Sequence, residues 1–167
     1  MSESQIHTIK EIAQKISEEN DRRQRVSHTI NELLAERQEV LVGYCELAAL
    51  EAGGAELDQV LAELRRFTQM LVDYTALGHF EIYQRIMEGN ERRESIKAIA
   101  NEIYPIIVRT TDFFVEFNDK YDGADDRDSL VPLQDDLSLI GEAMASRIEK
   151  EDKLLREMSN QVLYRNN

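Results

Sequence analysis

The stretch "IKAIANEIYPIIVRTTDFFVEFNDKY", residues 96–121, carries an apolar stripe at steps of three and four residues. That spacing places the apolar side chains on one face of an α-helix, which has about 3.6 residues per turn. Pro105 removes one backbone hydrogen bond inside the stretch, so we expect a kink there. The stripe comprises Ile96, Ile99, Ile103, Ile107, Thr110, Phe114, Phe117 and Tyr121.

Three further stretches show the same period. Gly53-Gly54 ends the first, Gly89-Asn90 ends the second, and Pro132 suits the first turn of the last. Four long helices joined by short turns predict an all-α protein, an antiparallel up-down four-helix bundle. The stripes comprise Val26, Ile30, Leu33, Arg37, Leu41, Tyr44 and Ala48; Leu64, Phe67, Leu71, Tyr74, Gly78, Ile82 and Ile86; and Leu133, Leu137, Ile140, Met144, Ile148, Leu155, Met158 and Val162.

The N-terminal residues 3–20 show a fifth, shorter amphipathic pattern with Ile6, Ile9, Ile12 and Ile16. The charge-rich sequence "EENDRRQR", residues 18–25, separates this pattern from the first long stripe. We therefore expect an extra N-terminal helix, an appendage over residues 1–25, ahead of a bundle domain over residues 26–167.

The composition limits the partners that the chain can bind. Its 167 residues include 33 acidic and 20 basic side chains, a net charge of −13, which repels nucleic acid and anionic membranes and attracts basic protein surfaces. The sequence has no apolar run long enough to span a membrane, and its N-terminus lacks the pattern of a signal peptide. We expect a cytoplasmic protein that binds neither nucleic acid nor membranes directly.

The acidic residues are concentrated between Asp112 and Asp136, where nine carboxylates face only Lys120 and Arg127, a net charge of −7. The simpler interpretation is a solvated connection between helices. The alternative is a patch that imitates the charge of nucleic acid for a basic partner.

The residues that enzymes and metal sites require are scarce. Cys45 is the only cysteine, which excludes an internal disulfide and a thiolate zinc site, and we expect it in the core. The three histidines include no Glu-x-x-His pair, so a di-iron bundle site is not predicted. Phosphate-binding glycine loops and nucleophile motifs are also absent from the sequence. We predict no catalysis, no metal and no cofactor.

Polar residues within the stripes need an explanation. Arg37 and Glu151 lie among apolar positions, and a structural ion pair explains them most simply. In "LVDYTALGHFEIYQRI", residues 71–86, Gly78 marks a kink, a packing contact, or a break that lets Asp73, His79 and Tyr83 converge. The alternative is a solvent-facing Asp73 and a hydrogen-bonded histidine at the rim of the bundle.

This last stretch closely resembles the LVDY and GHF signature of the Rsd/AlgQ family, bacterial regulators of the housekeeping sigma factor. Three other stretches resemble family motifs in the same order: "RQEVLVGYCEL" (37–47), "EIYPII" (102–107) and "LIGEAMASRIEKEDKLL" (139–155). The resemblance extends from about residue 26 to residue 158. It implies an antiparallel four-helix bundle, in agreement with the stripes.

The resemblance also implies an anti-sigma factor. Such a protein binds the C-terminal, promoter-reading region of the housekeeping sigma factor, a basic helix-turn-helix module, and occludes its contacts with −35 DNA and with core RNA polymerase. Partner-binding roles are implied for Leu33, Arg37, Asp73, His79, Phe80 and Tyr83, and a supporting polar network for Glu151 and Asp152. The family commonly has Asp-Arg-Trp-Leu where this chain has Asn31-Glu32-Leu33-Leu34, so an aromatic anchor is missing.

Two other functions remain compatible with the sequence. The chain could be an acidic helical adaptor for another cytosolic regulator or for core RNA polymerase. It could also be a bundle that binds or converts a small molecule around Asp73 and His79.

Overall fold

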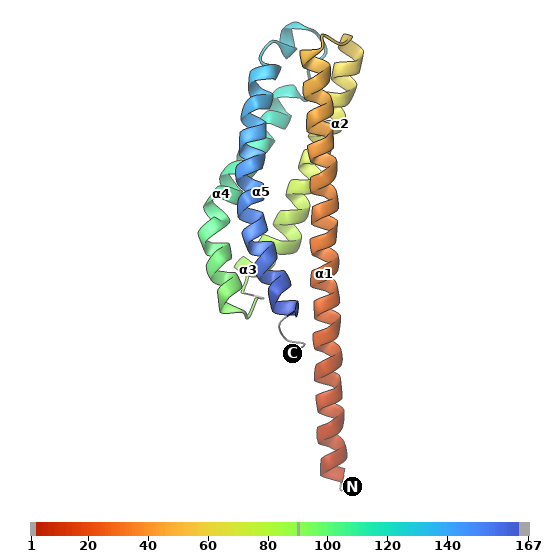
Figure 1. The fold of residues 1–167 in the computed structure, drawn as a ribbon, viewed down its shortest axis with the longest axis vertical. Coiled ribbons are helices and arrows are strands. Elements are labelled where there is room, and N and C mark those ends of the chain that lie inside the picture. The colour runs from red at the N-terminus through yellow and green to blue at the C-terminus, as the bar shows by residue number, and fades with distance from the viewer. Residues whose placement is uncertain (1–2, 90, 164–167) are drawn as a thin grey trace.

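A computed structural model describes residues 3–89 and 91–163 (Figure 1). The helices are α1 (Glu3–Ala52), α2 (Leu57–Gly78), η1 (His79–Tyr83), α3 (Gln84–Met87), α4 (Glu94–Tyr121), η2 (Asp128–Leu130) and α5 (Leu133–Leu163). No strand occurs in these ranges, so the all-α class is confirmed. The outer ends of the predicted domains 1–25 and 26–167, Asn90 and the side chain of Val162 lie outside the described residues.

The long helices α1, α2, α4 and α5 lie side by side, and consecutive ones run in opposite directions (Figure 1). α2 packs against α1 and α4, while α5 packs against α4 and α1. The buried apolar side chains of these helices therefore form one core. Within the described residues, no helix is long and apolar enough to cross a membrane.

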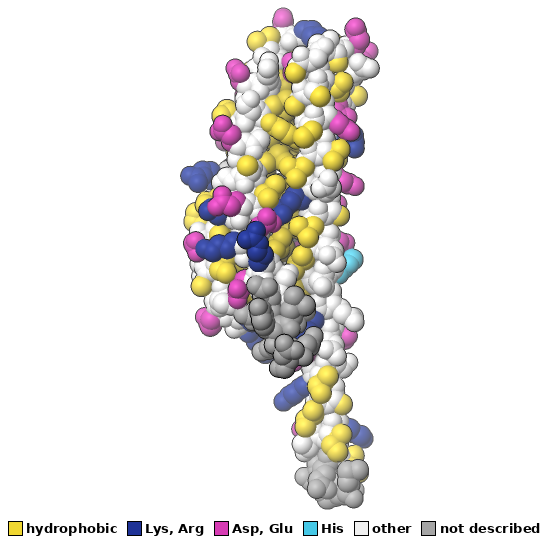
Figure 2. All heavy atoms as spheres, in the orientation of Figure 1, with side chains coloured by type: hydrophobic (Ala, Val, Ile, Leu, Met, Phe, Trp, Pro, Cys, Tyr) yellow, Lys and Arg dark blue, Asp and Glu magenta, His cyan; other side chains and the backbone are white. Residues whose placement is uncertain are grey.

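The N-terminal segment is helical but is not a separate helix. α1 is one continuous helix of 50 residues, and its first half extends beyond the bundle (Figure 1). The charge-rich residues 18–25 do not separate two helices, because this segment contains no glycine or proline, and Arg23 pairs with Glu19 one turn earlier at 2.9 Å. The isoleucines of this half remain exposed at 41–55%: Ile6, Ile9, Ile12 and Ile16 (Figure 2).

The core follows most of the predicted stripes. Every position predicted in the stripe from Leu64 to Ile86 is buried. In α5, however, Arg147 is buried and Ile148 is only half-buried. Residue 147 lies three residues after Met144 and four residues before Glu151, which fits the helical period. The apolar pattern therefore predicted burial of Ile148, although the buried residue is Arg147. The expectation for Cys45 was also wrong, because this residue lies off the buried stripe of α1 and is exposed.

The connections contain the predicted helix-ending residues. Gly54 and Gly89 have φ values of 65° and 81°, in the left-handed region that glycine tolerates best. α4 continues through Pro105. The acidic segment includes η2, where the carboxylate of Asp126 accepts a hydrogen bond from the Ser129 N–H at 2.8 Å. Four of the nine carboxylates of this segment lie in the connection between α4 and α5, and the other five lie within these two helices.

Gly141 provides a test of the packing between α1 and α5. A Cβ at this position would collide with the hydroxyl of Tyr44, which donates a hydrogen bond to the Leu137 carbonyl at 2.8 Å. We expect Gly141→Ala to lower the free energy of unfolding by about 1–3 kcal/mol in chemical denaturation. Gly123→Ala is the control, because nothing lies within 4 Å of its Cβ position. Equal stability of the two variants would contradict this packing.

Candidate functional site

The GHF stretch forms a π-helical turn at the end of α2. In η1, the N–H of Gln84 donates to the carbonyl of His79, five residues earlier, instead of four as in an α-helix. The wider turn buries the adjacent side chains of Ile82 and Tyr83 while Phe80 remains exposed. Such turns are often found at functional sites, so this element is the first candidate.

Gly78, directly before this turn, makes a packing contact. It is buried, and a Cβ there would lie 3.6 Å from Leu33 Cδ1 and 3.6 Å from Tyr83 Cε2. The convergence of Asp73, His79 and Tyr83 does not form. Asp73 is exposed, His79 is half-buried, and Tyr83 is 1% exposed.

His79 and Phe80 line a small apolar pocket between α2 and α4. Phe80 is 60% exposed, and its ring meets that of His79 edge-on, with the two centroids 5.0 Å apart. The pocket has a volume of about 210 Å³ and is lined by Val72, Thr75, Ala76, His79, Phe80, Thr111, Phe114 and Val115. This pocket could receive one apolar side chain of a partner.

Asp73 lies on the exposed side of α2 that faces α1. Its carboxylate accepts a hydrogen bond from the Gln69 side chain at 2.9 Å. Partial burial, together with the charges of Glu39, Asp73 and Glu32, raises the pKa of Glu36 on α1. The surface shared by α1 and α2 therefore concentrates negative charge.

The other residues predicted to bind a partner lie inside the bundle. Leu33 is completely buried, and the Arg37 side chain is 9% exposed. Tyr83 is also buried, as stated above. These three residues present almost no surface, so they can influence a partner only through the positions of the helices.

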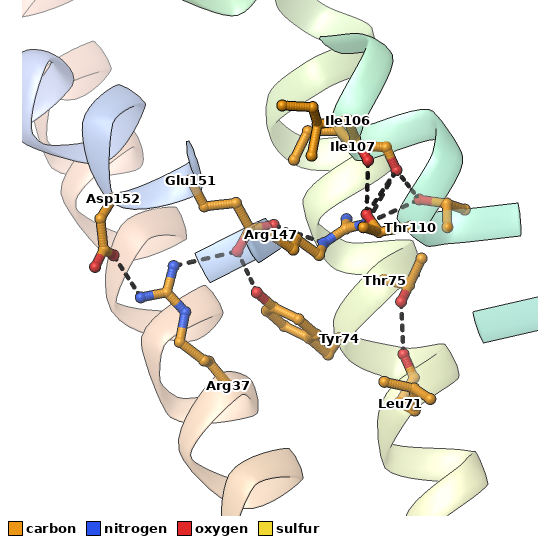
Figure 3. Close-up of polar contacts among 11 residues, drawn as sticks. Arg37, Leu71, Tyr74, Thr75, Ile106, Ile107, Thr110, Arg147, Glu151 and Asp152 are labelled. Carbon is orange, nitrogen blue, oxygen red and sulfur yellow. Dashed lines mark hydrogen bonds and ion pairs between the residues drawn. The ribbon is translucent and has the colours of Figure 1, made fainter. Parts of the chain in front are cut away.

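Arg37, Glu151 and Asp152 form the predicted polar network (Figure 3). Arg37 of α1 donates from Nη2 to Glu151 Oε2 at 3.1 Å and from Nη1 to Asp152 Oδ1 at 2.6 Å, both on α5. The Tyr74 hydroxyl of α2 donates to the same Glu151 oxygen. The network thus joins three helices around one buried carboxylate.

Arg147 extends this network to α4. Its side chain is fully buried, and its Nε donates to Glu151 Oε1 at 3.0 Å. Its Nη1 donates to the Thr110 hydroxyl at 3.1 Å, the Thr111 hydroxyl at 2.9 Å and the Ile107 carbonyl at 3.2 Å (Figure 3). Two arginines and two carboxylates balance in charge, which a buried ionic cluster requires.

Comparisons with known proteins agree with the motifs. Residues 12–159 match the family described as regulator of RNA polymerase sigma(70) subunit, Rsd/AlgQ. A Regulator of sigma D from Yersinia enterocolitica is 35% identical over 130 residues, 76% of this chain and 78% of that relative. The chain belongs to the Rsd/AlgQ family. A Regulator of sigma D from Enterobacter sp. (strain 638) is 34% identical over 121 residues, 71% of this chain and 73% of that relative. No solved structure matches the chain.

This Rsd/AlgQ chain contains two network residues that our sequence analysis did not select. Arg147 lies within the stretch that resembles the last-helix motif, four residues before Glu151. Tyr74 lies within the LVDY motif, where we predicted only an apolar stripe position. The sequence does contain a signal for Arg147. A basic residue at a position that the helical period buries requires an acidic partner.

The network of this family member predicts a response to alkaline pH. Burial, reinforced by the charge of Glu151, raises the pKa of Tyr74 above the ordinary value of about 10. A raised folded-state pKa means that this contribution to stability is complete below pH 10 and is lost as the pH rises toward the folded-state value. We expect unfolding free energies from urea titrations to fall above about pH 10, and to fall less steeply for Tyr74→Phe. Equal slopes would contradict this role of Tyr74.

Proposed function

We propose that this chain is a non-catalytic anti-sigma factor that binds the C-terminal, promoter-reading region of the housekeeping sigma factor. The family match over residues 12–159 carries the proposal. The relatives named Regulator of sigma D, each covered over more than two thirds of its length, support it. The structural part of the proposal is an antiparallel four-helix bundle that presents one face of α2 and η1 to this partner.

The proposed contact surface comprises Asp73, His79 and Phe80. Phe80 and its pocket supply apolar contact area, and the carboxylates on the surface shared by α1 and α2 supply negative charge. A helix-turn-helix module that reads DNA is basic, so charge attraction would speed its encounter with this surface. Desolvated apolar contacts at the centre would supply most of the affinity.

The buried residues have a positioning role in this proposal. Leu33 and Tyr83 pack around Gly78 at the start of the π-helical turn. Arg37 fixes α1 to α5 through Glu151 and Asp152. These contacts hold α2 and η1 in place, so that Phe80 stays exposed beside its pocket.

The proposed mechanism is occlusion. A bundle bound over the recognition helix would block the −35 promoter element, and the same complex would cover the surface that meets core RNA polymerase. The protein acts by covering surfaces and needs no bound cofactor or metal for this. We infer a cytoplasmic site of action, where the sigma factor and core polymerase are found.

The test is calorimetric titration of the full chain into the purified C-terminal region of its own housekeeping sigma factor. We expect a dissociation constant of about 10 µM or below. Asp73→Ala/His79→Ala should weaken binding while leaving the circular dichroism spectrum unchanged. A promoter fragment carrying the −35 element should compete with this protein for the sigma region.

Two outcomes would contradict the proposal. Absence of heat and of co-elution at concentrations of about 50 µM would exclude this sigma region as the partner. Binding of sigma and −35 DNA at the same time would exclude occlusion of the promoter contact.

A further inference from the structure

A second pocket has the opposite charge to the rest of the molecule. It lies between the N-terminal half of α1 and the segment from η1 to the start of α4, and its volume is about 470 Å³. Six of the fourteen arginines in the sequence line it. They are Arg22, Arg23 and Arg25 of α1, Arg85 of α3, and Arg92 and Arg93 directly before α4. We call this site the arginine pocket.

The arginine pocket carries excess positive charge. The lining includes three glutamates, so six arginines leave it at +3, whereas the remainder of a chain with net charge −13 carries −16. Two of the arginines are neutralised locally, Arg23 by Glu19 at 2.9 Å and Arg93 by Glu91 at 2.8 Å.

Four arginines remain available to a ligand. Arg22, Arg25, Arg85 and Arg92 are exposed, and none forms an ion pair within the described part of the chain. Every basic residue of the lining is an arginine, although the sequence contains six lysines. The planar guanidinium group binds phosphate oxygens in pairs, which makes arginine especially suited to phosphate recognition.

The pocket also has an apolar floor. Ile82, Ile86 and Met158 are buried, and Val26 is half-buried, while four of the six arginines are exposed above them. A ligand that places phosphates on the arginines and a flat ring on this floor would use both halves. A volume near 470 Å³ lies within the range of small-molecule sites.

We propose that the arginine pocket binds a small ligand of the nucleotide class, with two or more phosphates on the arginines and the base on the apolar floor. A long nucleic acid fits less well, because its backbone would extend over a surface that carries −16. A compact ligand stays within the pocket. Salt screens its repulsion from the acidic surface at distances beyond about 8 Å. This site is separate from the proposed sigma surface at Phe80.

The test is calorimetric titration of the full chain with ATP in the absence of divalent cations. We expect one ATP per chain, with affinity that falls as NaCl increases. Arg85→Ala/Arg92→Ala should weaken binding by about tenfold or more, because each arginine–phosphate contact is a charge-assisted hydrogen bond. Arg65→Ala/Arg109→Ala removes the same charge from exposed positions of α2 and α4 outside the pocket and should change affinity by less than about twofold.

Further probes distinguish the sources of binding. Pyrophosphate should bind more weakly than ATP, and a polyglutamate peptide should not displace ATP. Equal binding of pyrophosphate and ATP would overturn the role of the apolar floor, and displacement by polyglutamate would indicate an acidic protein segment instead. No binding at about 1 mM ATP, or equal loss in both double variants, would overturn the site. If Arg85→Ala/Arg92→Ala melts earlier than wild type, Arg22→Ala/Arg25→Ala tests the same pocket from α1.

Discussion

Glu151→Ala is expected to lower the free energy of unfolding by about 3–5 kcal/mol, because it leaves buried arginine charge without its main partner. Glu151 is 1% exposed and accepts hydrogen bonds from Arg37, Arg147 and Tyr74, which belong to three different helices. Arg147 then keeps only the neutral acceptors of α4, and Arg37 keeps only Asp152. Urea unfolding followed by far-ultraviolet circular dichroism measures this loss.

The matched control is Glu149→Ala in the same helix. Glu149 is 75% exposed, and within the described part of the chain its ion pair is with its neighbour Lys150, so the expected change is within about 0.5 kcal/mol. A third variant, Arg147→Met/Glu151→Leu, should be less destabilised than Glu151→Ala, because it removes buried charge of both signs together. Equal stability of Glu151→Ala and Glu149→Ala would mean that water replaces the carboxylate without cost.

The sequence predicted the helices and their glycine-containing ends better than it predicted the start of α1. Apolar periods found the buried faces of α2 and α4, and every predicted position from Leu64 to Ile86 is buried. The continuity of α1 was missed because a charged segment such as residues 18–25 was interpreted as a junction, although arginine and glutamate favour helices. Charge density alone does not end a helix, whereas Gly54 and Gly89 have positive φ values shortly after the helices α1 and α3.

The site was predicted in part. Motif matching selected Arg37, Glu151 and Asp152, which do meet in the structure. The same matching could not separate exposed residues from buried ones, because a motif does not show which face of a helix a residue occupies. Leu33 and Arg37 are buried in α1, and the π-helical turn shifts the face presented after Gly78. Tyr83 is therefore buried while Phe80 is exposed.

The burial of Leu33 shows what the absence of the family's tryptophan at this position changes. Leu33 is fully buried and would lie 3.6 Å from a Cβ at Gly78. A leucine at this position therefore changes the packing beneath the π-helical turn and does not remove an exposed contact. The exposed aromatic residue near the turn is Phe80.

Phe80→Ala is accordingly expected to weaken binding of the C-terminal sigma region by about thirtyfold, equivalent to about 2 kcal/mol, if the proposed surface is correct. Phe80 is the single exposed phenylalanine in the described part of the chain, and aromatic side chains beside a pocket frequently dominate an interface. Stability should change little, because a side chain that is 60% exposed contributes little to the core.

Val131→Ala is the control for this measurement, since Val131 is 78% exposed and lies in the connection between α4 and α5, away from the pocket. Calorimetry should give Val131→Ala the wild-type affinity. Equal affinities of wild type and Phe80→Ala would exclude the pocket as the centre of the interface, whereas weaker binding of Val131→Ala alone would place the contact over the acidic end of the bundle. The two variants thus decide between an interface centred on the π-helical turn and one centred on the connection between α4 and α5.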